Sequence, residues 1–131
     1  MQIIPCGVAL IRRGREFLIS QRHADDTFGG YWEFPGGKRD KGETLTECVV
    51  REVREELDIE ITVGRKLFDI QKKYNDRIVR LNFFLCSYVC GEPKALESQQ
   101  IQWVDVLKLE KFKFPPANRI VIKKLKKIVL S

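Results

Sequence analysis

The sequence contains a single histidine, and its four cysteines form no C-x-x-C pair. A structural zinc site of the Cys/His type is therefore not expected. Cys6, Cys48 and Cys86 lie within apolar patterns, which is typical of reduced core thiols in a cytoplasmic protein. The chain has no apolar stretch long enough for a membrane span and no signal-peptide pattern, and its first apolar run ends at Arg12. We therefore expect a cytoplasmic protein without disulfides.

Several well-known catalytic signatures are also missing. Neither the G-x-x-x-x-G-K-[ST] phosphate loop nor the G-x-S-x-G nucleophile elbow occurs, and no internal repeat or linker is visible. With 131 residues, of which 44% are hydrophobic and 32% charged, the chain is suited to one globular core and is too short for two ordinary domains. We expect a single domain that spans residues 1–131, and a monomer.

The chain has a formal net charge of +6, and much of the excess lies near its end. A positive charge is suited to steering a polyanionic substrate. No aromatic side chain lies among the lysines of residues 123–127, so stacking on single-stranded nucleic acid is not expected. We interpret these lysines as a solvated helix face. The alternative, a nucleic-acid patch, would give a salt-dependent affinity for DNA.

Hydrophobic periodicity and turn signals predict a mixed sheet with helices packed on it. Thr44 and Glu47 form a capping-box pattern at the start of the first helix, and Asn75-Asp76 is a hairpin signal. Proline near residue 116 suits the first turn of the last helix. The predicted strands are residues 2–12, 16–22, 31–34, 60–73, 77–89 and 101–106, and the predicted helices are residues 44–57 and 116–129.

The most informative segment runs from the glycine turn at Gly36-Gly37 through the first helix. Apolar residues mark the buried stripe of this helix, and Glu52, Glu55 and Glu56 lie close to its edge. Residues three and four apart on a helix are neighbours, so these carboxylates are expected to converge. Like charges held so close need a cation, and a cluster of carboxylate oxygens suits Mg²⁺ or Mn²⁺. We therefore predict that the three glutamates are metal ligands.

The segment resembles the signature of the Nudix hydrolases, G-x5-E-x7-R-E-U-x-E-E-x-G-U, in which U is a bulky aliphatic residue. The single departure is Asp58, which stands where the family has glycine; aspartate tolerates the left-handed conformation better than most residues. The resemblance implies the Nudix α/β/α sandwich. The matching positions are Gly37, Glu43, Arg51, Glu52, Val53, Glu55, Glu56 and Ile59.

The resemblance also assigns roles around the metal. It implies that the carbonyl of Gly36 joins the metal ligands, since a glycine turn lets the backbone approach an ion. Glu43 and Arg51 are expected to form an ion pair that supports the loop, together with Gly37; the alternative for the pair is a direct part in catalysis. Lys38 is a candidate contact for the leaving phosphate, or else a surface lysine. Glu52, Glu56 and Glu97 are the candidate catalytic acids, Glu97 being a further possible metal ligand.

The general base is left open between Glu52 within the motif and Glu97 in the loop at residues 94–100. A general base must reach the attacking water. The exposed loop acid would ordinarily be inert, but related enzymes carry a catalytic or metal-binding acid at this place before a strand, and loops on a rigid scaffold often carry function.

Beyond the motif, the runs QRHADD, WEFPGGK, NDR, GEP and FPPAN resemble MutT-type 8-oxo-dGTP pyrophosphohydrolases. Position by position, Asn118 would hydrogen-bond the purine, since its amide is both donor and acceptor. Phe34 would face the base, Arg22 would hold the sugar-phosphate part, and the backbone of Arg77 would lie near the base. The alternatives are a helix cap for Asn118 and a core position for Phe34.

The predicted function is Mg²⁺-dependent hydrolysis of 8-oxo-dGTP to the monophosphate and pyrophosphate, which removes mutagenic precursors from the nucleotide pool. A CTP or 5-methyl-dCTP pyrophosphohydrolase is the main alternative, and asparagine at position 118 favours the purine branch. Other nucleoside triphosphatases and dinucleoside-polyphosphate hydrolases stay open. A non-catalytic nucleotide-binding domain is disfavoured, because such domains typically lose acids that this motif retains.

Overall fold

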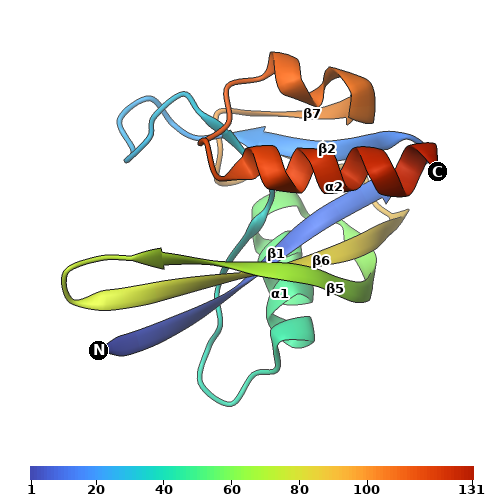
Figure 1. The fold of residues 1–131 in the computed structure, drawn as a ribbon. Coiled ribbons are helices and arrows are strands. Elements are labelled where there is room, and N and C mark those ends of the chain that lie inside the picture. Colours follow the sequence, from blue (N-terminus) through green and yellow to red (C-terminus); the bar gives the residue numbers. More distant parts are fainter.

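Two long parallel strands form the centre of the computed structural model, which describes residues 1–131. Strand β1, Gln2–Arg13, pairs with β6, Arg77–Cys90, along almost its whole length. Parallel neighbours need a crossover connection, and here it contains helix α1, Leu45–Leu57. On its other side β6 pairs antiparallel with β5, Glu60–Lys73, so the predicted hairpin is present (Figure 1).

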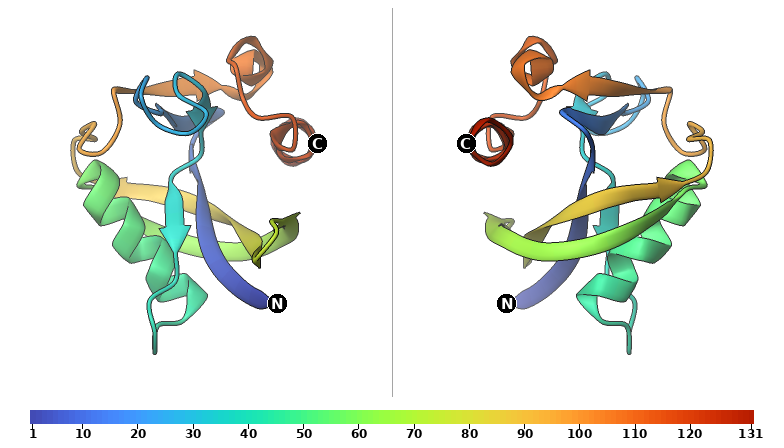
Figure 2. Two further views of the ribbon diagram at one scale, coloured as in Figure 1. Left: turned by 90° about the vertical axis from the view of Figure 1, so that its left-hand side faces the viewer. Right: turned by 90° about the vertical axis from the view of Figure 1, so that its right-hand side faces the viewer.

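On its other edge β1 meets two different partners. It forms a short hairpin with β2, Glu16–Gln21, and then diverges from it, so that β4, Gly36–Lys38, pairs with β1 at Cys6–Val8. The segment expected as a glycine turn is therefore an edge strand, because the divergence of β1 and β2 leaves the backbone groups of β1 free to pair with it. β2 in turn pairs with the short β3, Trp32–Glu33, and with β7, Gln100–Asp105, and the sheet splays open (Figure 2).

Helix α1 begins and ends as its sequence predicts. The hydroxyl of Thr44 accepts from the Glu47 N–H at 3.1 Å, and the Thr44 N–H donates to the Glu47 carboxylate at 2.9 Å, which completes the capping box. At the other end Asp58 has φ 57° and ψ 39°, the left-handed conformation that its place in the motif requires. Gly7 lets α1 approach β1 closely, since a Cβ there would lie 2.7 Å from a methyl group of Val49.

The C-terminal region differs from the prediction in two places. Strand β7 ends at Asp105, one residue early, because its carboxylate accepts from the Leu107 N–H at 2.9 Å and starts a 3₁₀ helix, η1, Val106–Lys111. Sequence periodicity did not predict η1, since such short helices have no repeat long enough to recognise. Helix α2, Asn118–Leu130, begins two residues after Pro116, and its N-cap is Ala117 without a side-chain cap.

The sheet separates two hydrophobic cores, because neighbouring residues of a strand face opposite sides. Leu10 and Phe83 pack in the core beneath α2 and η1, whereas Ile11 and Phe84 pack in the core beneath α1. This is the expected α/β/α sandwich. No helix is long and apolar enough to cross a membrane. All four cysteines are free thiols, and burial raises the pKa of Cys86 to about 12, so this thiol stays protonated.

Candidate active site

Glu56 is the most perturbed acid of helix α1. Its Oε2 accepts a hydrogen bond of 3.1 Å from the N–H of Gly36 on β4. Burial, followed by the neighbouring carboxylate of Glu52 and the more remote charge of Glu33, raises the pKa of Glu56 to about 9. Two ionised carboxylates cannot share such a site without a compensating cation. The pair is therefore suited to bind a positively charged ion.

Arg51 ties the acids of the helix to the loop that precedes it. Its Nε donates to Glu43 at 2.7 Å and one terminal nitrogen to the carbonyl of Lys38 at 3.0 Å. The second terminal nitrogen contacts Glu52 at 2.9 Å and Glu55 at 3.2 Å. The bonds from Arg51 and from the Asp40 N–H lower the pKa of Glu43 to about 2, and those from the acids raise the pKa of Arg51. The ion pair between Glu43 and Arg51 is thus the centre of a larger network.

The three glutamates do not converge as their spacing alone suggested. The guanidinium of Arg51 lies between Glu52 and Glu55, and Glu56 turns toward the backbone of Gly36. No three carboxylate, histidine or cysteine side chains are gathered in a geometry that would hold a metal ion. Helical spacing places side chains on one side of a helix, but competing hydrogen-bond donors decide where their oxygens point.

Glycine is required on β4 because backbone and carboxylate lie very close together there. A Cβ on Gly37 would lie 2.5 Å from a carboxylate oxygen of Glu52, and a Cβ on Gly36 would lie 2.2 Å from the carbonyl oxygen of Gly7. Real Cβ atoms essentially never come within these distances. The backbone of Gly36 and Gly37 is consequently held against the acids of α1, with no side chain in between.

A pocket of about 160 Å³, here called the central pocket, lies between β4, the β-sheet and the start of α2. It brings two predicted substrate residues, Phe34 and Asn118, to the same cavity as Gly36 and Gly37. Phe34 is also a core residue, because its ring stacks on Phe114 at 5.2 Å. The capping alternative for Asn118 is not supported, since the N-cap of α2 is Ala117 and makes no side-chain bond. The lining residues are Cys6, Val8, Glu33, Phe34, Gly36, Gly37, Lys72, Leu81, Phe83, Pro115 and Asn118.

Two charged residues of this pocket, Glu33 and Lys72, were not predicted. Burial raises the pKa of Glu33, and an ion pair of 3.0 Å with Arg22 opposes that effect. The only feature of the sequence that could have pointed to Glu33 as a pocket residue is its place in the WEFPGGK run that carried the resemblance. Lys72 gave none, since it belongs to an ordinary lysine pair in β5.

The remaining predicted residues lie around the pocket or away from it. Arg22 does not line the pocket and reaches it only through Glu33, and Lys38 is exposed at the end of β4. Arg77 lies at the tip of the β5–β6 hairpin, where its side chain covers the ring of Tyr74 at 4.8 Å. Arg77 does not line the central pocket. The strand register places Leu81, four residues further along β6, beside that pocket instead.

Glu97 lies in the exposed loop after β6. The N–H of Leu96 in this loop donates to the carbonyl of Glu56 at 3.1 Å, and the N–H of Lys94 donates to the carbonyl of Leu57 at 2.9 Å. These two bonds hold the loop against the C-terminal end of α1. Glu97 is therefore next in the chain to a residue anchored on Glu56, while its own side chain is exposed.

A family profile described as the NUDIX domain matches residues 7–124, which include β4, α1 and both sides of the central pocket. The chain belongs to the Nudix hydrolase family. Nudix hydrolases generally need a divalent metal.

Individual relatives agree with this assignment. The 8-oxo-dGTP diphosphatase of Escherichia coli (strain K12) is 36% identical over 129 residues, which cover 98% of this chain and 100% of the relative. The CTP pyrophosphohydrolase of the same strain is 34% identical over 118 residues, covering 90% and 87%. The solution structure of the E. coli ORF135 protein superimposes with a TM-score of 0.86 at 31% identity, over 98% of this Nudix chain and 91% of that one.

Proposed function

We propose that this Nudix hydrolase converts 8-oxo-dGTP to 8-oxo-dGMP and pyrophosphate with Mg²⁺, Mn²⁺ being able to replace it. One observation carries the proposal: Phe34 and Asn118 share a cavity with the backbone of Gly36 and Gly37, which is held against Glu52 and Glu56. An aromatic ring and an amide suit a nucleobase, and acids beyond a glycine backbone suit the metal-bound phosphates of the same nucleotide. The relative named 8-oxo-dGTP diphosphatase supports the choice of base.

The acids of α1 fit Mg²⁺ by their chemistry. Glu52, Glu55, Glu56 and the carbonyl of Gly36 offer only oxygen donors, which this ion prefers. The raised pKa of Glu56 beside Glu52 indicates a pair that is short of positive charge. Bound there, the ion would neutralise charge on the phosphates and acidify a bound water, so that a carboxylate could remove its proton more easily. Arg51 would then have to release Glu55, and it would still hold Glu43.

In the reaction, the oxygen of a water attacks the β-phosphorus, and the bond from that phosphorus to the α–β bridging oxygen breaks. The products are the nucleoside monophosphate and pyrophosphate, and the proton of the water passes to a carboxylate. The two candidates for this carboxylate are Glu52, which lies against Gly37, and Glu97, whose loop is bonded to the backbone of Glu56. Asn118 orients the base by donating and accepting one hydrogen bond each.

Pyrophosphate release with Mg²⁺ tests the proposal directly. The substrates are 8-oxo-dGTP, dGTP, CTP and 5-methyl-dCTP at equal concentrations, and a dinucleoside polyphosphate is assayed alongside them for mononucleotide products. We expect the highest kcat/KM for 8-oxo-dGTP. A higher value for either cytosine nucleotide would reject the base assignment, and no release from any of them would reject the enzymatic assignment.

A second candidate function is hydrolysis of CTP, which the relative named CTP pyrophosphohydrolase favours. Its identity to the chain is close to that of the 8-oxo-dGTP diphosphatase, so similarity alone does not separate the two. Asn118 separates them by experiment. Asn118→Asp removes the amide donor, and we expect it to shift preference from 8-oxo-dGTP toward a cytosine nucleotide. A loss of both activities in equal proportion would speak against a role in base choice.

A further inference from the structure

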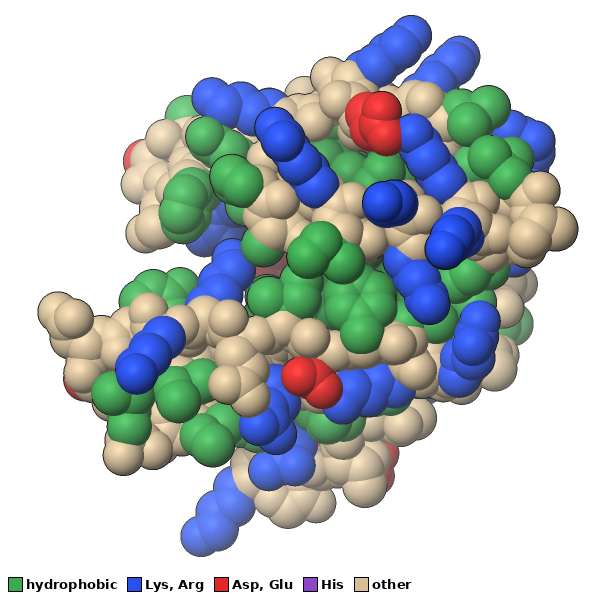
Figure 3. All heavy atoms as spheres, in the orientation of Figure 1, with side chains coloured by type: hydrophobic (Ala, Val, Ile, Leu, Met, Phe, Trp, Pro, Cys, Tyr) green, Lys and Arg blue, Asp and Glu red, His purple; other side chains and the backbone are tan.

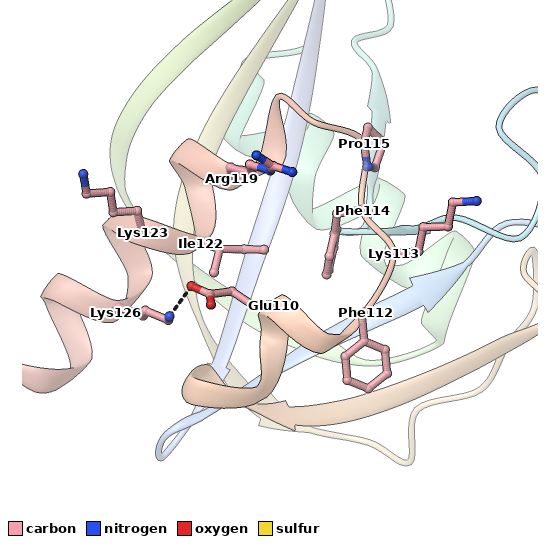
Figure 4. A pocket seen from close by; sticks show the side chains of 9 residues that line it. All are labelled: Glu110, Phe112, Lys113, Phe114, Pro115, Arg119, Ile122, Lys123 and Lys126. Carbon is pink, nitrogen blue, oxygen red and sulfur yellow. Dashed lines mark hydrogen bonds and ion pairs between the residues drawn. The ribbon is translucent and has the colours of Figure 1, made fainter.

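A larger cavity lies outside the site described above, between η1, α2 and the segment that joins them. Its volume is about 750 Å³, which is within the usual range for small-molecule sites. We call it the η1–α2 pocket. Figure 4 shows its lining residues: Glu110, Phe112, Lys113, Phe114, Pro115, Arg119, Ile122, Lys123 and Lys126.

The middle of the η1–α2 pocket is apolar. Ile122 of α2 and Phe114 of the joining segment point toward one another across it (Figure 4). Both side chains are held in place from behind, since Ile122 is 4% exposed in the core beneath α2 and η1 and the Phe114 ring stacks on Phe34. The pocket therefore offers a preformed apolar surface on which a flat ring can lie.

Charged groups lie at the two ends of this apolar surface. At one end the guanidinium of Arg119 points toward the Pro115 segment, and at the other Glu110 and Lys126 form an ion pair (Figure 4). Arg119 has no carboxylate partner, and Lys123 lies one turn further along the same helix. Glu110 is the single acid of the lining and is already bonded to a lysine. The surface around α2 is also mainly basic (Figure 3).

We propose that the η1–α2 pocket binds a nucleoside monophosphate. Its ring would lie between Ile122 and Phe114, and its phosphate would bind Arg119, whose planar fork matches phosphate oxygens. The Glu110–Lys126 pair at the far end offers an acceptor and donors to the polar edge of a base. The proposal requires only the cavity and its charges, and so it does not depend on which triphosphate the enzyme hydrolyses.

Such a ligand would act on the central pocket through a shared wall. Pro115 lines both cavities, and Phe114 in the η1–α2 pocket stacks on Phe34 in the central one. A ring that packs on Phe114 therefore fixes the Phe34 side chain indirectly. A coupling of this kind is reciprocal, so a nucleotide in the central pocket would change the affinity of the η1–α2 pocket by the same factor.

The experiment is an NMR titration of the full chain with dGMP, observed at the methyl groups of Ile122. This residue lines the η1–α2 pocket and not the central pocket, so nuclear Overhauser effects between base protons and its methyl groups identify the site directly. Deoxyguanosine alone and inorganic phosphate alone separate ring binding from anion binding. The test variant is Arg119→Glu, and its control is Lys124→Glu. Both reverse a positive charge on α2, but Lys124 does not line the pocket.

We expect saturable contacts from dGMP to Ile122, with much weaker binding of deoxyguanosine and of phosphate. Arg119→Glu should weaken dGMP binding at this site by at least about tenfold, the factor expected for one charge-assisted hydrogen bond. Lys124→Glu should change it less than about twofold, as a distant surface charge does. Contacts confined to residues of the central pocket, equal losses in the two variants, or equal affinity for deoxyguanosine would each overturn the proposal.

Discussion

The two cavities meet at Pro115 and present opposite charges to a nucleotide. Beside the central pocket lie the acids Glu52 and Glu56, and burial together with the neighbouring Glu52 raises the pKa of Glu56. The η1–α2 pocket has cations around an apolar middle. A phosphate can enter the second cavity as it is, whereas the first needs divalent cations before it can accept a triphosphate. In the functions proposed above, the central pocket is the place where bonds are broken and the η1–α2 pocket is a place that only binds.

The largest expected effect is a loss of hydrolysis when an acid of α1 beside the central pocket is replaced. Glu56→Gln keeps the size of the side chain and removes its charge, so hydrolysis should fall by roughly 10³-fold, corresponding to several kcal/mol of lost metal-dependent stabilisation. Pyrophosphate release at saturating Mg²⁺ measures this. The matched control is Glu60→Gln, a half-buried acid just beyond α1 that pairs with Arg54. If both variants kept normal rates, Glu56 would not be needed for hydrolysis, and the central pocket would no longer differ from the η1–α2 pocket by its metal-binding acids.

Asn118 lies in the central pocket at the start of α2, close to the η1–α2 pocket. Its substitution tests substrate selectivity rather than rate. Asn118→Ala should raise the KM for 8-oxo-dGTP roughly tenfold and leave that for dGTP within about twofold, because a lost hydrogen bond to a specific base edge is felt only by the base that made it. Steady-state kinetics on both nucleotides measure it. The neighbouring Ala117→Gly is a control for changes at the start of α2. Equal increases on both substrates would remove Asn118 from base recognition.

Arg51 tests whether the acid region holds together without a metal. Arg51→Met leaves Glu52 and Glu55 without their shared donor. We expect the midpoint of thermal unfolding to fall by roughly 4 °C, the shift for about 1 kcal/mol in a chain of this size. Added Mg²⁺ should raise the midpoint of the variant more than that of the original protein, since the ion replaces the lost positive charge. Equal shifts in the two proteins would indicate that the metal binds elsewhere.

The smallest effect is the pH dependence of the Glu43–Arg51 pair. The pKa of Glu43 is about 2 in the folded protein and 4.5 ordinarily. Because the folded value is the lower one, its stabilising contribution is complete above about pH 5 and is lost as the pH falls through 4.5 toward 2. Urea unfolding of the original protein and of Glu43→Gln should therefore differ at pH 7 and converge near pH 2. A constant difference over this range would exclude the ion pair as its cause.

Much of the acid region could be predicted from sequence because its signals are local. The capping box of Thr44 and Glu47 lies within one turn, and Asp58 ends the helix where the motif requires it. Both were confirmed, as were the hairpin of β5 and β6 and the Nudix sandwich. The fixed spacing of glycine, acids and arginine was enough to identify the family, since few other structures need that pattern.

The remaining features depend on contacts between distant segments. The pairing of β4 with β1 follows from where β2 diverges, which no local pattern records. The place of Arg51 between Glu52 and Glu55 results from competition among donors, and that of Arg77 at a hairpin tip results from register. The η1–α2 pocket is formed by residues from three segments and has no motif at all.

Side chains of β1 alternate between the two cores, so β1 should tolerate an inserted residue much less well than the surface turns do. Leu10 and Ile11 belong to opposite cores, so one added codon within β1 would exchange every inward and outward side chain beyond it and disrupt both layers together. The turn between Lys73 and Arg77 does not contribute side chains to two cores, and it should accept added residues with little loss of stability. Length variation among related genes is thus expected to collect at that turn and to avoid the first strand.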